Sequence, residues 1–239
     1  MSVSVPDLGA VFAAYERVAA EADALFARVQ QLHPDCVTCT AGCGDCCHAV
    51  FDLSLVEAMY LNRRFAEVIP HGPLRSAILQ AAAEVDRPLT RLKRGYYQSV
   101  RDAGKEAAAS AEAPEQAAER AIGHVLEEAA RARVRCPLLL ADDTCALYDS
   151  RPITCRLYGV PAVIGGQTHV CGKSAFATGG RYPTVHMDKI QDRLDALSLE
   201  IRNTLGSRYS ELHKVYVPVS MALLTNYDAA YLGVGPARE

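Results

Sequence analysis

The chain has 239 residues, a formal net charge of −3 at pH 7, and hydrophobic side chains at 50% of its positions. A domain of this length can bury a sizeable core, so it does not depend on disulfides to stay folded. The acidic balance gives no support for nucleic-acid binding. No apolar run approaches the roughly 18 residues of a membrane span, and the acidic N-terminal stretch is unlike a signal peptide. We therefore expect a single cytoplasmic domain over residues 1–239, bound to neither nucleic acid nor a membrane.

The first part of the chain is predicted to be helical. Between residues 6 and 32, apolar side chains recur every three or four positions, which is the period of an amphipathic helix. His33-Pro34 should end this helix, because the residue before a proline avoids the α region. A second helix is predicted over residues 54–69, where Ser54 and Glu57 have the spacing of a capping box.

Two more helices are predicted before the composition changes. Residues 74–109 keep a helical period, and Pro88 should kink or split that segment. A further helix is predicted over residues 115–134, in a stretch rich in Ala and Glu that is typical of a solvated helix. Beyond it the chain carries prolines, turn residues and short apolar runs, which indicate irregular structure.

The last third of the chain combines a hairpin with helices. A β-hairpin is predicted at Gly165-Gly166. A strong helix over residues 185–205 should end at Gly206, and a short helix is expected within residues 217–233.

The predicted fold class is mainly α. A helical frame would carry two irregular cysteine-rich metal-binding loops and a short β-hairpin. The metal-binding core is expected over residues 36–171, between an N-terminal helix at 6–32 and C-terminal helices at 185–230.

Nine cysteines fall into two clusters. The first occupies the stretch CVTCTAGCGDCC and comprises Cys36, Cys39, Cys43, Cys46 and Cys47. The second comprises Cys136, Cys145, Cys155 and Cys171. Because cytosolic thiols stay reduced, and because an odd number cannot pair completely within one chain, the clusters indicate metal ligands or redox groups before disulfides.

A metal explains the first cluster better than the alternatives do. Short cysteine spacings let two thiolates reach one ion from a tight turn, and Gly42 and Gly44 allow such a turn beside Cys43. Tetrahedral zinc and a cubane iron–sulfur cluster each take four such ligands. Free cysteines that act as small apolar residues need apolar surroundings, which suits at most Cys36. A catalytic cysteine is usually single, with a basic partner.

The cysteine motifs resemble a known family. The run CTAGCGDCC, followed by CPLL and TCALYDSRPITCRLYG, is similar to the YkgJ family of cysteine-cluster proteins, which are proposed to chelate zinc or iron. The second segment matches the family pattern at Cys145, Leu147, Tyr148, Arg151, Pro152, Cys155, Arg156 and Tyr158. The first run departs from it, because three residues separate Cys39 from Cys43 where the family has two, and Cys36 is additional. The resemblance covers residues 36–171.

The resemblance implies eight family-type cysteines as metal ligands. They are Cys39, Cys43, Cys46, Cys47, Cys136, Cys145, Cys155 and Cys171. Eight thiolates could form two four-thiolate sites, or one cluster built from both loops with the remaining cysteines structural or redox-active. Adjacent side chains point in different directions, so we expect only one of Cys46 and Cys47 to ligate a given site.

An iron–sulfur cluster of the [4Fe–4S] type is favoured over zinc. Thiolates stand nearly alone, and no paired His has zinc-finger spacing; His48 and His169 are minor candidate ligands for zinc. The flagellin lysine methylases are similar in cysteine arrangement and are associated with an iron–sulfur cluster. CTAGCGDC also has the C-x3-C-x2-C spacing of radical-SAM enzymes, but those need a β/α barrel and usually carry an aromatic residue where this chain has Asp45.

Two arginines bracket Cys155 and are candidate cofactor-binding residues. The guanidinium groups of Arg151 and Arg156 would offset the negative charge of a thiolate site and donate hydrogen bonds to sulfur. Other polar features have simpler interpretations. Asp142-Asp143 indicates a turn, and the basic stretch over residues 91–101 indicates the solvated face of a helix.

These features predict a metal-binding protein that holds an iron–sulfur cluster, either as a redox or electron-transfer component or as a cluster-dependent enzyme. A zinc-stapled interaction module without catalysis is the alternative. A SAM-dependent modifying enzyme related to the flagellin lysine methylases is a weaker one. A protein or small-molecule partner is expected, and whether the chain is an enzyme stays open.

Overall fold

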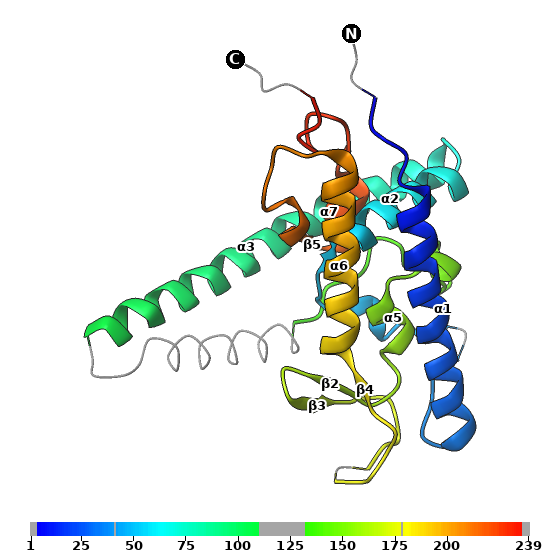
Figure 1. The fold of residues 1–239 in the computed structure, drawn as a ribbon. Coiled ribbons are helices and arrows are strands. Elements are labelled where there is room, and N and C mark those ends of the chain that lie inside the picture. Colours follow the sequence, from blue (N-terminus) through cyan, green and yellow to red (C-terminus); the bar gives the residue numbers. More distant parts are fainter. Residues whose placement is uncertain (1–3, 41, 110–131, 178, 236–239) are drawn as a thin grey trace.

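The computed structural model describes residues 4–40, 42–109, 132–177 and 179–235 (Figure 1). Helices dominate these residues, so the predicted mainly α fold class is confirmed. The α-helices are α1 (Gly9–Leu32), α2 (Leu55–Val68), α3 (Pro73–Ala109), α5 (Ile153–Leu157), α6 (Met187–Leu205) and α7 (Val219–Leu224). The strands are β1 (Leu53–Ser54), β2 (Ala162–Ile164), β3 (Gln167–His169), β4 (Val185–His186) and β5 (Tyr216–Val217). No helix in these described ranges is long and apolar enough to cross a membrane.

Helix α1 forms one side of the main core. It packs against α5 and α6, which lie beside it in Figure 1. The apolar positions that predicted an amphipathic helix are the buried ones, including Phe12, Tyr15 and Val29. The helix begins at Gly9 rather than residue 6, because Asp7 Oδ1 accepts a hydrogen bond from the Gly9 N–H at 3.0 Å and fixes the turn before it. It ends at Leu32, as predicted from His33-Pro34.

Helix α2 is the central helix of the fold. Its residues contribute both to the core formed with α1 and α6 and to a second core formed with α3 and α7. The predicted capping box is confirmed, since the Ser54 N–H donates to Glu57 Oε2 at 3.2 Å. The other carboxylate oxygen of Glu57 accepts the N–H of Ile153 at 3.1 Å, so this buried side chain also positions the start of α5.

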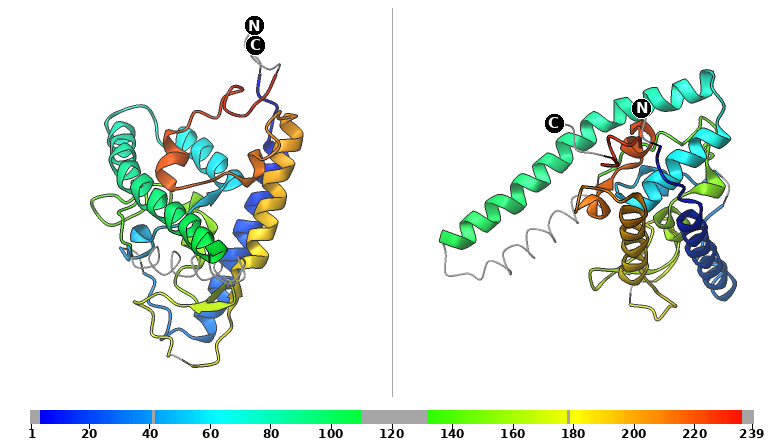
Figure 2. Two further views of the ribbon diagram at one scale, coloured as in Figure 1. Left: turned by 90° about the vertical axis from the view of Figure 1, so that its left-hand side faces the viewer. Right: turned by 45° about the horizontal axis from the view of Figure 1, so that its top comes forward.

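Helix α3 spans the residues predicted to be helical between 74 and 109. Pro88 lies inside one helix from Pro73 to Ala109 and does not split it. Pro88 is exposed, so the carbonyl that loses its hydrogen-bond partner can be hydrated. The first half of α3 packs on α7, and the second half extends away from the other helices (Figure 2). The helix predicted over residues 115–134 falls mostly outside the described residues, and its end was wrong, because Arg133 pairs with Ala49 in a β-bridge.

The hairpin and the last helices follow the sequence prediction closely. Strands β2 and β3 pair across Gly165 and Gly166, whose φ values of 55° and 77° suit a two-residue turn. Helix α6 ends at Gly206, which has φ 57°. One boundary was wrong: the predicted helix over 185–205 begins at Met187, because Val185 and His186 form β4, parallel to β2.

Candidate metal centre

The two cysteine segments meet at a cavity of about 590 Å³. Backbone hydrogen bonds join them: the Cys136 N–H donates to the Cys47 carbonyl at 2.7 Å, and the Val134 N–H donates to the His48 carbonyl at 3.0 Å. All nine cysteines are free thiols. Those that line the cavity are Cys39, Cys43, Cys46, Cys47, Cys136, Cys145 and Cys155.

The first cysteine segment turns tightly at its glycines. Gly42 has φ 83°, a conformation that favours glycine, and the chain then enters a single 3₁₀ turn at Cys46–His48. The Cys47 N–H donates to the Gly44 carbonyl at 3.1 Å. This turn presents the two adjacent cysteines to the cavity.

The second segment carries its thiols on a turn and a short helix. The chain reverses between Cys136 and Cys145, and the Ala146 N–H donates to the Leu138 carbonyl at 2.9 Å. Asp142 accepts the N–H of Thr144 at 3.1 Å, which confirms the predicted turn and gives this carboxylate a structural partner. Cys155 lies on α5, whose start is held by Glu57.

Five of the thiols that line the cavity are close enough for the charges of some to act on the others, and we call these five the inner thiols. They are Cys46, Cys47, Cys136, Cys145 and Cys155. Hydrogen bonds from the thiols of Cys155 and Cys47 hold the pKa of Cys46 well below its usual range. The same hydrogen bonds, together with burial, raise the pKa values of the two donors.

Backbone N–H groups point at several of the sulfurs. Burial raises the pKa of Cys136 to about 12, while the N–H groups of Leu138 and Leu139 act in the opposite direction. The N–H of Leu147 acts in the same way on Cys145, whose pKa burial also raises. Donors at these positions stabilise thiolate charge, as the surroundings of a metal-bound thiolate must.

Cys171 lies outside the cavity and contacts a carboxylate that sequence analysis did not select. Its Sγ donates to Asp45 Oδ2 at 3.3 Å. The other oxygen of Asp45 lies 2.7 Å from Arg133 and 4.0 Å from Lys173. Burial alone would raise the pKa of Asp45. The hydrogen bonds from Cys171 and Arg133 outweigh burial and hold this pKa below its usual range.

Cys39 lies where the cavity meets the main core. A Cβ atom at Gly159 would come within 2.2 Å of its sulfur, so the close approach requires glycine there. Burial raises the pKa of Cys39 to about 11, with contributions from the nearby charges of Cys43, Cys171 and Cys46. Neither Asp45 nor Gly159 has a sequence signature, apart from the position of Asp45 between two cysteines.

The two arginines predicted to bind a cofactor both line the cavity, and both contact Asp23 of α1. Arg156 is buried and fully engaged: it donates to the Arg151 carbonyl at 2.9 Å, to the Asp149 carbonyl at 2.6 Å, and to Asp23 of α1. Arg151 stacks on Tyr148, 3.9 Å from the ring centroid. Its charge favours the thiolate forms of cysteines on both loops.

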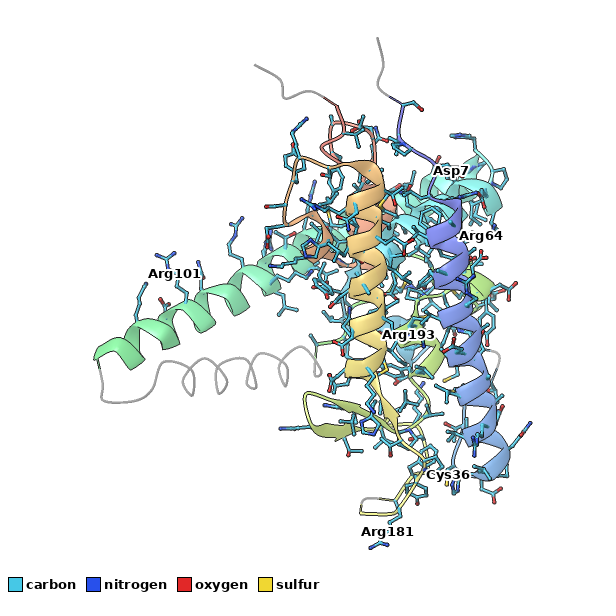
Figure 3. All side chains as sticks on the ribbon, viewed as in Figure 1. Asp7, Cys36, Arg64, Arg101, Arg181 and Arg193 are labelled. Atoms are coloured by element: carbon cyan, nitrogen blue, oxygen red, sulfur yellow. The ribbon has the colours of Figure 1, made fainter. Side chains whose placement is uncertain are left out.

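The histidines considered as zinc ligands, and Cys36, do not line the cavity. The His48 ring nitrogen Nδ1 lies 2.9 Å from the Gly44 carbonyl, and His169 is exposed on β3. Cys36 packs against the main core near the end of α1, as Figure 3 shows, and its carbonyl accepts the N–H of Ala175. The basic side chain of Arg101 is exposed on the extended half of α3.

The donor set suits a thiophilic metal in its chemistry. Backbone N–H groups and the guanidinium of Arg151 act on thiols that can become thiolates. The inner thiols themselves are all sulfur ligands, which thiophilic metals prefer. In the described part of the chain, no three His, Cys, Asp or Glu side chains are already arranged to hold a metal ion. Thiol side chains would therefore rotate on binding, as expected when metal binding and local folding are coupled.

Comparisons with known proteins add no relative. No protein-family model, curated protein or solved structure matches the chain.

Proposed function

We propose that this chain is a metal-binding cysteine-cluster protein whose inner thiols hold an iron–sulfur cluster of the [4Fe–4S] type. The gathering of five thiols at one cavity is the observation that supports it. Such clusters are usually held by four cysteine thiolates. The resemblance of the motifs to the YkgJ family points in the same direction.

The chain offers a definite ligand set for this cluster. Cys136, Cys145 and Cys155 would supply three thiolates, and one of the adjacent pair Cys46 and Cys47 would supply the fourth. When bound, the cluster would supply electron transfer or, at an iron without a protein ligand, substrate activation. Arg151 would offset part of the negative charge of the site, and the N–H groups of residues 138, 139 and 147 would donate to the sulfurs.

The cavity supports a small-molecule partner beside the cluster. A volume of about 590 Å³ lies within the range of roughly 300–1,000 Å³ that is typical of ligand sites. Apolar side chains from three helices also line it, among them Phe26, Leu89 and Val219. This room favours a cluster-dependent enzyme or a redox protein with an organic substrate over a closed structural site.

The test compares two cysteine substitutions in protein purified without oxygen. Cys155→Ala removes an inner thiol, and Cys36→Ala is the matched control because Cys36 does not line the cavity. We expect Cys155→Ala to lose the iron, the acid-labile sulfide and the absorption near 400 nm, whereas Cys36→Ala keeps all three. A colourless wild-type protein with zinc at the inner thiols would overturn the proposal and support the zinc-stapled module.

A further inference from the structure

Polar side chains form a row along one face of helix α3, and we call this row the α3 stripe. Its members follow one another at alternating steps of four and three residues, so they lie within about 80° of each other around the helix axis. The row extends from residue 87 to residue 105, or about 27 Å along the helix. Every member is exposed, and all but one are basic. The members are Arg87, Arg91, Arg94, Gln98, Arg101 and Lys105.

The opposite face of α3 packs on the protein. Val85 and Leu89 lie about half a turn around the helix from the stripe and line the cavity, and Leu89 is buried. Lys93 also lies off the stripe, and it forms an ion pair with Asp52. Arg101 projects from the part of α3 that extends away from the other helices (Figure 3). The stripe therefore occupies the face of α3 that is open to solvent.

The cations of the stripe are largely unpaired. None of its four arginines forms an ion pair with an acidic side chain of the described residues. Lys105 has only Asp102, which is 2.9 Å away on the same helix and is itself exposed. Like charges three or four residues apart repel along a helix. A row of this kind thus opposes helix stability slightly, and an acidic partner would relieve the repulsion.

The spacing of the row fits a second helix lying alongside α3. Alternating steps of three and four residues average 3.5, which is the repeat at which two helices packed side by side bring their side chains together. A helix with Asp or Glu at the same steps would place a carboxylate against each cation. Arginine suits this contact, because its planar guanidinium can bind a carboxylate through two parallel hydrogen bonds.

Other anionic partners fit the stripe less well. Binding in the plane of a membrane surface needs apolar side chains on the face that meets the lipid, and the stripe contains none. A nucleic acid carries its charge along its whole length. It would extend beyond the stripe and be repelled by the rest of a chain whose net charge is −3. An acidic helix no longer than the stripe avoids both difficulties.

We propose that the α3 stripe is a docking surface for an acidic helix of a partner protein. The partner helix lies along α3 and carries carboxylates at alternating steps of three and four residues. Its contact with the stripe is electrostatic, so salt weakens it. This inference goes beyond the proposed function and does not depend on the metal at the inner thiols.

Two synthetic helical peptides test the pattern. The first carries a Glu opposite each member of the stripe. The second has the same composition with its Glu residues distributed around the helix, and both are crosslinked to equal helicity. In fluorescence anisotropy titrations with the full chain, we expect the first peptide to bind at least about ten-fold more tightly at low salt and to lose this advantage at about 1 M salt, where charges are screened within about 3 Å. Equal affinity of the two peptides, or no binding of either, would overturn the proposal.

Two pairs of substitutions test the location. Arg91→Gln/Arg94→Gln removes two cations of the stripe, and Arg17→Gln/Arg28→Gln is the matched control that removes two exposed cations from α1. The first variant should bind the patterned peptide at least about five-fold more weakly, as expected from the loss of two exposed charge pairs, and the control should change its affinity by less than about two-fold. Equal losses would show a general attraction between opposite charges and would overturn the proposal.

A charge exchange and two other anions complete the test. Arg91→Glu/Arg94→Glu should lose the patterned peptide and recover binding when the peptide carries Lys at the two facing positions; no recovery would contradict the helix-on-helix arrangement. Duplex DNA and phosphatidylserine vesicles are tested with the same proteins. Tighter binding of either one than of the patterned peptide, lost in Arg91→Gln/Arg94→Gln, would replace the acidic helix by a nucleic acid or a membrane as the partner of the stripe.

Discussion

Substituting Gly159 by alanine tests the position of the Cys39 sulfur without removing any thiol. The new Cβ would lie 2.2 Å from Cys39 Sγ and 3.4 Å from the Phe26 ring. Non-bonded atoms of this size separate at about 3.5–4.0 Å, so the sulfur must move by about 1.5 Å. Overpacking should therefore lower the free energy of unfolding by about 1–3 kcal/mol.

The assay is urea unfolding of the wild type and of both variants. Gly172→Ala is the matched control, because a Cβ atom at Gly172 meets nothing within 4 Å although the residue is adjacent to Cys171. This control should change the free energy of unfolding by less than about 0.5 kcal/mol. A Gly159→Ala protein as stable as Gly172→Ala would refute the close approach of the Cys39 sulfur to residue 159.

Two further predictions concern the frame that carries Cys155. Arg156→Ala leaves two carbonyls without their donor and leaves Asp23 with only the longer contact to Arg151, so it should lower the free energy of unfolding by about 2–4 kcal/mol in urea titrations. Arg193→Ala removes the exposed pair with Glu21 between α6 and α1 (Figure 3) and should cost less than about 1 kcal/mol; equal losses would contradict the role given to Arg156. Burial raises the pKa of Glu57 above its unfolded value near 4.3. The folded state therefore holds this proton more tightly, and the contribution of Glu57 to stability falls as the pH rises from about 4.3 through its folded pKa. Subtracting the unfolding free energies of Glu57→Gln from those of the wild type across pH 4–8 should isolate that fall, and a difference independent of pH would contradict it.

Local signals in the sequence predicted most of the fold. Apolar periodicity identified α1 and α6, a capping box fixed the start of α2, and Gly165-Gly166 located the hairpin. The errors arose where distant residues decide the structure. Val185 joins a strand because β2 lies beside it, and Arg133 pairs with Ala49. Neither partner can be identified from local periodicity.

The candidate site was likewise predicted where local sequence signals exist and missed where distant residues meet. The cysteine clusters and their approach across the fold were predicted from spacing and from the family resemblance. The contact between Cys171 and Asp45 was not, because the two residues are far apart in the sequence. The sequence did not predict the roles of Asp45 and Gly159. Asp45 acts through its contact with Cys171, and Gly159 matters because it has no side chain where the Cys39 sulfur approaches. Arg156 was grouped with Arg151, although only the structure shows that its donors are used by Asp23 and two carbonyls.

The most direct test of the iron–sulfur proposal is the amount of iron, acid-labile sulfide and zinc per chain in wild-type protein purified without oxygen. We predict about four iron and four sulfide per chain, with a broad absorption near 400 nm that bleaches on reduction. A colourless protein with two zinc ions and no iron would contradict the iron–sulfur centre. It would assign the inner thiols to structural zinc instead.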